Sequence, residues 1–265
     1  MDSIKLNNGV LISRIGYGVY EIPPSITEEC VLNALKVGYR HIDTSAYYQN
    51  EKEVGIAIKK SGIPREEIFI TTKMTGARNY AQAVNMIEAA LNKLQLEYID
   101  MMLIHWPSGD NVAMYKAMED YYRKGKLRAV GLSNFYGGDL KQILDNCQIV
   151  PMVNQIETHV FRNQKEEQKK LKEKGILLES WSPLASGSGN IFTNKTLLEI
   201  ADKHHKSVAQ IALRYLYQRD ILIIPRSTKI DRMRENMDIL DFSLDDEDNR
   251  KIENLNKDRS LFGWY

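Results

Sequence analysis

The chain has 265 residues, of which 43% are hydrophobic and 27% charged, and its formal net charge at pH 7 is +1. This balance gives no electrostatic reason to expect nucleic acid or an acidic membrane as a partner. The length allows either one large core or two small domains.

The amino terminus and the cysteines indicate a soluble protein of a reducing compartment. The first residues, MDSIKLNNGV, lack the basic and apolar regions of a signal peptide, and no apolar stretch approaches the ~20 residues that cross a bilayer. Cys30 and Cys147 have neither metal-ligand nor redox spacing. We therefore expect a cytoplasmic protein without a membrane partner.

The predicted elements begin with a β-hairpin and continue with short buried strands. Residues 4–12 read as a hairpin around the turn residues Asn8 and Gly9. Apolar or β-branched runs follow, each about as long as one strand that is buried on both faces. In chain order these runs are Ile15–Val19, Arg40–Asp43, Ile68–Lys73, Ile99–Ile104, Ala129–Leu132, Met152–Ile156, Ile176–Ser180 and Ile221–Ile224.

The segments between these runs have the periodicity of amphipathic helices. One apolar stripe lies at residues 84, 87, 91 and 94, and another at residues 208, 211, 212, 215 and 216. Ser25 with Glu28, and Ser207 with Gln210, have the spacing of capping boxes that start helices. Strands that alternate with helices predict a parallel sheet, because each crossover returns the chain to the same edge.

Two parallel architectures compete for this pattern. A doubly wound dinucleotide fold should open with G-x-G-x-x-G, but residues 16–21 (GYGVYE) lack the third glycine and lead into Pro23 and Pro24. About eight units in an unbroken chain of this length fit a (β/α)₈ barrel better. We predict an α/β protein with one TIM-barrel domain over residues 1–265, a hairpin that covers the barrel bottom, and a short C-terminal tail.

Polar residues of unusual kinds stand at the predicted strand ends, where the loops of a barrel build its active site. Asp43, Lys73 and His105 end or follow three consecutive strands, and Tyr48 lies five residues past Asp43. Each of these types alone is more often a cap or a solvated charge. The joint arrangement of the four is what predicts a catalytic group.

The chemistry of this group is specific to proton transfer. A phenol has a pKa near ~10, too high for ready proton donation at neutral pH. A neighbouring ammonium lowers that pKa, and a carboxylate keeps the ammonium charged and placed. Tyr48 is therefore a candidate general acid for a carbonyl oxygen that becomes an alcohol, with His105 orienting that oxygen.

These motifs resemble those of the aldo-keto reductases along nearly the whole chain. Residues 38–44 (GYRHIDT) with residues 48–51 (YQNE) look like the signature that carries the catalytic Asp and Tyr. Residues 70–73 (ITTK) and 104–107 (IHWP) look like the segments that carry the catalytic Lys and His. The likeness is to the bacterial and protist branch of 2,5-diketo-gluconate reductases and prostaglandin F synthases. Its spacing assigns the role of the acid to Tyr48 rather than to the adjacent Tyr47.

The resemblance also implies a nicotinamide cofactor. Ser133, Asn134 and Gln155 match residues that bind the nicotinamide carboxamide, and Trp181 matches the aromatic ring that stacks on the nicotinamide. Arg226, where the family usually has Lys, favours NADPH over NADH, because guanidinium groups and helix N-terminal amides suit a 2′-phosphate. The other implied cofactor residues are Gly18, Val19, Asp43, Ser182, Leu184, Ile224, Pro225, Ser227, Thr228, Arg232, Glu235 and Asn236.

Aromatic and apolar residues around the same rim are the expected substrate contacts. The set comprises Tyr20, Tyr47, Tyr48, Met74, His105 and Trp106, with the tail Leu261–Trp264 as a further wall. The family commonly has Trp where Thr75 stands, and the loops at residues 108–111 and 186–190 are short. These departures imply an open pocket.

The sequence thus predicts an NADPH-dependent oxidoreductase that reduces aldehydes or ketones to alcohols and acts as a monomer. Small dicarbonyls such as methylglyoxal, keto-sugars such as 2,5-diketo-gluconate, and quinone or prostanoid-like carbonyls all stay open as substrates. The alternative is a barrel that binds NADPH in a regulatory or structural role with little catalysis. A metal-dependent hydrolase is disfavoured because the sequence shows no clustered His and Asp spacing, so we expect no metal.

Overall fold

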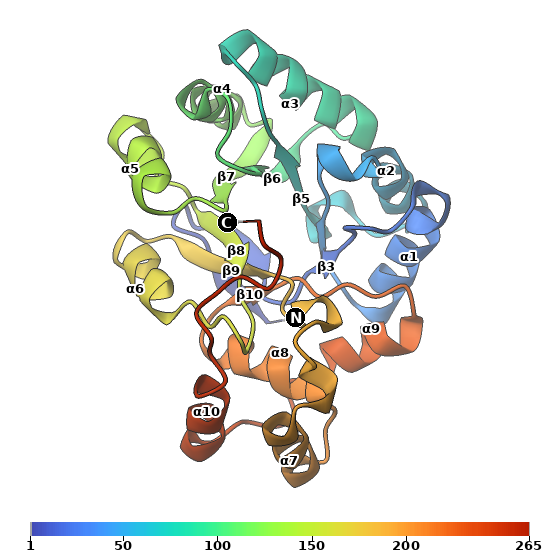
Figure 1. Cartoon of the computed structure of the whole chain (residues 1–265). Coiled ribbons are helices and arrows are strands. Elements are labelled where there is room, and N and C mark those ends of the chain that lie inside the picture. Colours follow the sequence, from blue (N-terminus) through green and yellow to red (C-terminus); the bar gives the residue numbers. More distant parts are fainter. Residues whose placement is uncertain (1, 265) are drawn as a thin grey trace.

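The computed structural model describes residues 2–264. Within them, eight parallel strands pair in chain order and form one curled sheet (Figure 1). Ile15 forms a parallel bridge with Ile223, and the backbone N–H of Gly16 donates to the Ile223 carbonyl at 2.8 Å. These bonds join the first strand to the last, so the sheet closes. The predicted (β/α)₈ barrel is confirmed, and the doubly wound alternative is wrong.

The strands lie within a few residues of the predicted runs. Every residue of β5 and β6 is buried, since one face of each strand packs in the barrel and the other packs under helices. The bounds in chain order are β3 Tyr17–Gly18, β4 His41–Asp43, β5 Phe69–Met74, β6 Ile99–Ile104, β7 Leu127–Ser133, β8 Val153–Glu157, β9 Leu177–Trp181 and β10 Leu222–Ile223.

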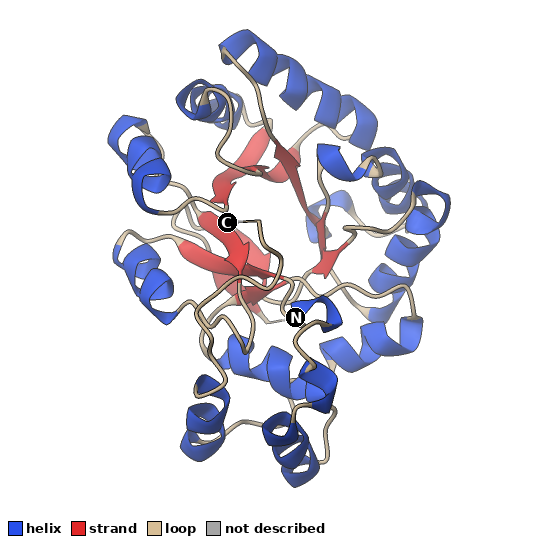
Figure 2. Ribbon diagram, viewed as in Figure 1, coloured by secondary structure: helices blue, strands red, loops and turns tan. Residues whose placement is uncertain are grey.

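Helices surround the strands as an outer ring (Figure 2). The ring consists of α1 Pro24–Val37, α2 Glu51–Lys60, α3 Tyr80–Leu94, α4 Asn111–Arg123, α5 Gly137–Asn146, α6 Lys165–Glu173, α8 Val208–Gln218 and α9 Ile230–Met237. Two further helices lie outside this ring: α7 Lys195–His204 packs on α8, and α10 Asp246–Glu253 packs on α7. Short 3₁₀ turns are η1 Ala46–Tyr48, η2 Arg65–Glu67, η3 Ala185–Gly187 and η4 Ile191–Thr193.

One predicted capping box is present and the other is not. Ser207 and Gln210 bond reciprocally at the start of α8. The prediction at Ser25 and Glu28 is wrong, because α1 begins at Pro24 and has no side-chain cap. A proline at the first helical position has its φ preset and carries no N–H that would need a partner. The proline therefore starts this helix one residue before the serine.

The amino-terminal hairpin covers the bottom of the barrel, as predicted. Its strands are β1 Ser3–Lys5 and β2 Leu11–Ser13, and Gly9 in the turn has φ of +87°. The side-chain amide of Asn7 donates to the carbonyls of Pro151 and Gly175, which precede β8 and β9. These contacts hold the turn against the amino ends of the strands, opposite the predicted catalytic rim.

The carboxyl-terminal tail crosses the opposite end of the barrel (Figure 1). The backbone N–H of Leu261 donates to Glu157 Oε1 at 2.9 Å, and this bond ties the tail to the end of β8.

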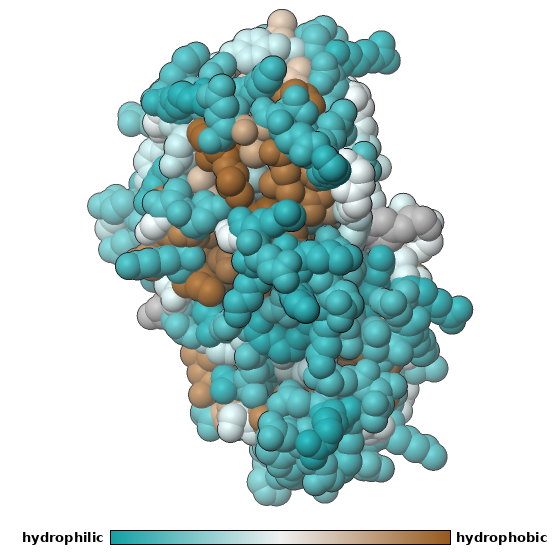
Figure 3. Space-filling model, turned by 90° about the vertical axis from the view of Figure 1, so that its left-hand side faces the viewer, coloured by the Kyte–Doolittle hydropathy of each residue, from teal (hydrophilic) through white to brown (hydrophobic). Residues whose placement is uncertain are grey.

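The side of the molecule on which α5 and α6 lie is largely hydrophilic, with apolar groups showing in a few places (Figure 3). No helix within the described residues is both long enough and apolar enough to span a membrane.

Candidate active site

A cavity of about 1340 Å³ opens at the carboxyl ends of the strands. The predicted site residues that line it are Gly18, Tyr20, Asp43, Tyr47, Tyr48, His105, Trp106, Ser133, Asn134, Gln155, Trp181, Ser182, Leu184, Ile224, Pro225, Arg226, Ser227, Thr228, Arg232, Glu235 and Asn236. Phe262 and Trp264 of the tail also line it. The barrel thus gathers at one mouth residues that are spread over most of the chain.

Two predicted contact residues lie away from this cavity. Met74 and Val19 are buried and are absent from the cavity lining, and their contact with a ligand stays a prediction. Successive side chains of a strand point to opposite faces. Because Lys73 faces the barrel interior, Met74 faces the surrounding helices.

Lys73 joins the acid and the phenol of the predicted catalytic group. Its Nζ donates to Asp43 Oδ1 at 2.5 Å and to the Thr44 carbonyl at 2.9 Å, and it lies 3.4 Å from the Tyr48 hydroxyl. Asp43 and Lys73 are both buried. A buried ammonium without a carboxylate partner would be strongly destabilising, so Asp43 is what allows a charged lysine here.

A 3₁₀ turn after β4 selects Tyr48 rather than Tyr47. The Ser45 hydroxyl accepts a hydrogen bond from the Tyr47 N–H at 3.1 Å and caps this turn, η1. The turn brings Tyr48 back beside Lys73, where its ring packs 5.1 Å from the Tyr20 ring. Tyr47 is 71% exposed. The spacing argument from the sequence therefore agrees with the geometry.

Burial outweighs the charge of Lys73 at the Tyr48 hydroxyl. Desolvation raises the pKa of Tyr48 to about 12, although the Lys73 ammonium acts to lower it. The sequence-based prediction that the pKa of Tyr48 is lowered is therefore wrong, although the contribution of Lys73 has the predicted direction. Burial also acts to lower the pKa of Lys73, but Asp43 and Tyr48 reverse this effect and the pKa is raised. The resting group therefore pairs a neutral phenol with a charged ammonium.

His105 follows β6 and is neutral in this environment. Burial and the nearby Lys73 charge lower the pKa of His105 to about 3. Its Nδ1 lies 3.2 Å from the Ser45 hydroxyl, and its ring is 5.6 Å from the Tyr48 ring. A neutral imidazole carries one N–H and can donate one hydrogen bond, so it can orient a carbonyl oxygen but has no proton to spare for it.

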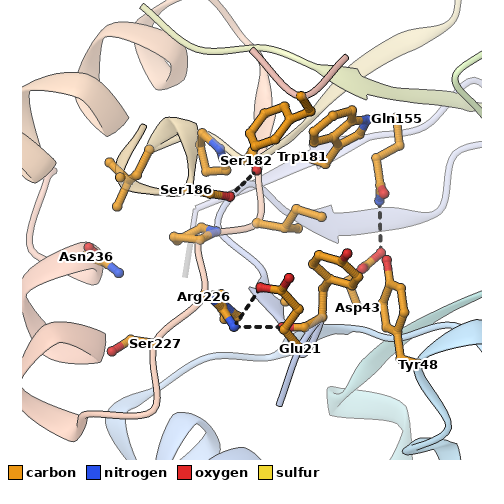
Figure 4. A pocket seen from close by; sticks show the side chains of 18 of the residues that line it. Glu21, Asp43, Tyr48, Gln155, Trp181, Ser182, Ser186, Arg226, Ser227 and Asn236 are labelled. Carbon is orange, nitrogen blue, oxygen red and sulfur yellow. Dashed lines mark hydrogen bonds and ion pairs between the residues drawn. The ribbon is translucent and has the colours of Figure 1, made fainter. Parts of the chain in front are cut away.

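The residues expected at a nicotinamide ring already hold one another in place. The Asn134 amide donates to the His105 carbonyl and to the Ser133 hydroxyl, both at 3.0 Å, and the Trp181 indole N–H donates to Asn134 Oδ1 at 2.8 Å. The Gln155 amide donates to Asp43 Oδ2 at 2.9 Å (Figure 4). These bonds fix the indole ring and the amides at one wall of the cavity.

The other end of the cavity is cationic. Arg226 lies 3.4 Å from Glu21 Oε2 and donates to the Tyr20 carbonyl at 3.2 Å (Figure 4). Arg232 lines the same end from α9. A Cβ added at Gly18 would lie 3.2 Å from the Ile224 carbonyl, so little room is left for a side chain at this position of the cavity lining. Guanidinium groups at one end and amides with an indole at the other fit an extended phosphate-bearing nucleotide.

Sequence reasoning did not single out Glu179, which lies on β9 with its side chain fully buried. Its Oε2 accepts a hydrogen bond from Gln155 Nε2 at 2.7 Å. The available signal was a carboxylate inside the apolar run at residues 176–180. Within the described part of the chain, no cluster of three or more His, Cys, Asp or Glu side chains is arranged to hold a metal ion.

The chain is similar to known proteins over nearly its whole length. Glyoxal reductase of Bacillus subtilis (strain 168) is 46% identical over 263 residues, covering 98% of this chain and 95% of that protein. The 9,11-endoperoxide prostaglandin H2 reductase of Trypanosoma cruzi (strain CL Brener) is 40% identical over 264 residues, covering 98% and 93%. A crystal structure of an aldo-keto reductase from a Medee basin deep-sea metagenome library has a TM-score of 0.96, with 41% identity, and the match covers 98% of this chain and 97% of that one.

The family resemblance drawn from the motifs is confirmed. The model of the Aldo/keto reductase family matches residues 13–257, which is nearly the whole chain. The barrel and its hairpin agree with that match. The chain belongs to the aldo/keto reductase family.

Proposed function

We propose that this protein reduces aldehydes and ketones to alcohols with NADPH, and that Tyr48 is the general acid. Membership of the aldo/keto reductase family supports carbonyl reduction. The observation that carries the proposal is the row of contacts from Asp43 through Lys73 to the Tyr48 hydroxyl, at a cavity that His105 also lines.

The raised pKa of Tyr48 suits a proton donor that waits for its substrate. At neutral pH the phenol keeps its proton until the carbonyl oxygen gains negative charge and becomes more basic than the phenolate. The tyrosinate that remains lies beside the Lys73 ammonium, and Asp43 keeps that ammonium charged and in place. His105 donates a hydrogen bond to the same oxygen and aims the carbonyl at Tyr48.

A nicotinamide cofactor in the groove would supply the hydride. The chain would hold its carboxamide with Ser133, Asn134 and Gln155 and offer the Trp181 indole for stacking. Both hydrogens of the Gln155 amide nitrogen are engaged by carboxyl groups, so this side chain can offer its oxygen as an acceptor. The contacts of these side chains in the structure keep the wall rigid before any ligand binds.

The cationic end of the cavity supports NADPH over NADH. Arg226, Ser227 and Arg232 line it together, and a 2′-phosphate would take the place of the Glu21 carboxylate on Arg226. An exposed ion pair contributes little stability, so Glu21 gives up this partner at small cost. A phosphate with charge-assisted bonds to a guanidinium gains more.

A small dicarbonyl is the substrate class that the pocket supports best. The tail places Trp264 with its ring 6.1 Å from that of Trp106 and 5.3 Å from that of Trp181, so aromatic rings narrow the mouth. The 46% identity with a glyoxal reductase supports the same class. Keto-sugars and other aldehydes would have to fit the same narrowed entrance.

The test is NADPH oxidation with a panel of glyoxal, methylglyoxal, simple aldehydes, keto-sugars and a quinone, with NADH measured beside NADPH. We expect turnover that is fastest with the small dicarbonyls and slower with NADH. NADPH binding without oxidation by any member of the panel would contradict the proposal and favour a regulatory or structural barrel.

A further inference from the structure

A second carboxyl group lies inside the barrel close to the catalytic group. Glu179 extends from β9, is fully buried, and accepts from Gln155 Nε2 at 2.7 Å. The same Gln155 nitrogen donates to Asp43 Oδ2 at 2.9 Å. One amide nitrogen therefore bridges two buried carboxyl groups, and these groups lie only two hydrogen bonds apart.

The charges in this interior do not balance if both carboxyl groups are ionised. Asp43 and His41 face Glu179 from β4, Lys73 faces it from β5, and Gln155 faces it from β8. The adjacent strand β10, Leu222–Ile223, carries no titratable side chain. His41 is neutral because burial and the Lys73 charge lower its pKa to about 3. One ammonium thus faces two carboxyl groups where solvent cannot screen them.

Geometry indicates which of the two carboxyl groups holds a proton. Asp43 is bonded directly to the Lys73 ammonium at 2.5 Å and also accepts from Gln155. Among the described residues, Oε1 of Glu179 has no hydrogen-bond partner and lies 3.9 Å from His41 Nδ1. A buried carboxylate oxygen without a donor is strongly disfavoured, whereas a protonated carboxyl group tolerates the site better.

We propose that Glu179 is a positioning residue that stays protonated while Asp43 is ionised, and that losing this proton at alkaline pH weakens proton donation by Tyr48. The consequence for turnover rests on the proposed reductase function. While Glu179 is neutral, the Lys73 charge acts on Tyr48 with only Asp43 opposing it. Once ionised, Glu179 adds a negative charge that offsets Lys73 and disfavours the tyrosinate left by proton transfer.

The midpoint of this change falls within an accessible pH range. Burial and the nearby Asp43 charge raise the pKa of Glu179 to about 8. Glu179→Gln removes the titration and keeps an oxygen that can accept from Gln155. For the wild type we expect kcat to fall about tenfold between about pH 7 and pH 9, the scale of one charge acting through a protein-like dielectric. Glu179→Gln should hold its neutral-pH kcat across the same range.

Infrared spectroscopy tests the proton directly and needs no turnover. In spectra of the wild type recorded at rising pH, we expect the carbonyl band of a protonated carboxylic acid to disappear near pH 8. At pH 7 and above, where ordinary Asp and Glu side chains are ionised, the band should be missing from Glu179→Gln. Glu157→Gln is the matched control, because Glu157 is also a buried glutamate but hydrogen bonds from His159 and from the Leu261 N–H, with Arg162 nearby, lower its pKa to about 2. That variant should keep the band.

The outcomes separate this inference from the proposed function. A wild type without the band at neutral pH, or a band that survives Glu179→Gln, would overturn the inference whether or not carbonyls are reduced, and so would equal pH profiles of kcat in the two proteins. An absence of turnover in both proteins would instead contradict the proposed function and leave the infrared result to decide the inference. The wild-type band keeps the test decisive even if Glu179→Gln does not fold.

Discussion

The candidate site shows burial and charge acting against each other on neighbouring residues. Asp43 holds Lys73 charged although burial disfavours that charge, and burial keeps Tyr48 protonated although Lys73 favours its loss of the proton. At His105, by contrast, burial and the Lys73 charge act in the same direction, and both keep the imidazole neutral. The result is a resting state in which each group has the protonation state that the proposed mechanism of carbonyl reduction requires.

Arg226 carries the residue-scale prediction about the cofactor. Arg226→Ala should raise the KM for NADPH by about 10- to 100-fold, the range for losing one or two hydrogen bonds to a charged group, and should change the KM for NADH little. Initial rates with each cofactor measure this effect. Arg234→Ala is the control, because Arg234 is exposed and forms an ion pair with Asp231 three residues before it. Equal losses with NADPH and NADH would contradict a 2′-phosphate role for Arg226.

The residue types at the site could be predicted from the sequence, whereas the net effect of burial and charge on their pKa values could not. Strand ends brought Asp43, Lys73 and His105 to one rim because parallel strands share a direction. The net pKa of Tyr48 depends on how completely other segments bury it, and no local pattern encodes that. Glu179 was missed for a related reason, since its link to the site is a hydrogen bond from Gln155 on another strand.

At the scale of the elements, apolar runs and turn chemistry specified most of the barrel. Buried strands read as continuous apolar runs because both of their faces are covered, and this gave their order and their approximate bounds. The start of α1 was misplaced because a proline at its first position replaced the expected serine cap. Met74 is absent from the cavity lining, because a one-residue step along a strand moves a side chain from one face to the other.

The prediction at the scale of the elements concerns stability and rests on the close packing of α2 against α3. A Cβ added at Gly55 in α2 would lie 2.1 Å from the carbonyl oxygen of Leu94, at the end of α3. Gly55→Ala should therefore destabilise the protein by about 1–3 kcal/mol, since overpacking outweighs the better helix propensity of alanine. Chemical denaturation measures this change.

Gly138 provides the matched control within α5. An added Cβ there meets nothing within 4 Å, so Gly138→Ala should be neutral or stabilise by up to about 1 kcal/mol. If Gly55→Ala were as stable as Gly138→Ala, the contact between α2 and α3 would be looser than the structure shows.

At the scale of the whole molecule, the two ends of the chain cover the two ends of the barrel. The hairpin closes the bottom of the barrel, and the tail brings Phe262 and Trp264 over the mouth beside Trp181. The bridge between Ile15 and Ile223 joins the first strand of the barrel to the last, so it forms only when both ends of the barrel sequence are in place. This closure accords with the single domain over residues 1–265 that the sequence predicts, and that domain organisation, the monomeric state and the cytoplasmic location stay predictions.

The central claim is that Tyr48 donates the proton, and one pair of variants tests it most directly. Tyr48→Phe should lower kcat for the best dicarbonyl by about 10²- to 10⁴-fold, the usual contribution of a general acid, with NADPH affinity by tryptophan fluorescence unchanged. Tyr47→Phe removes the hydroxyl of the exposed neighbour and should keep wild-type kcat. Substantial turnover by Tyr48→Phe, or an equal loss in Tyr47→Phe, would contradict the account.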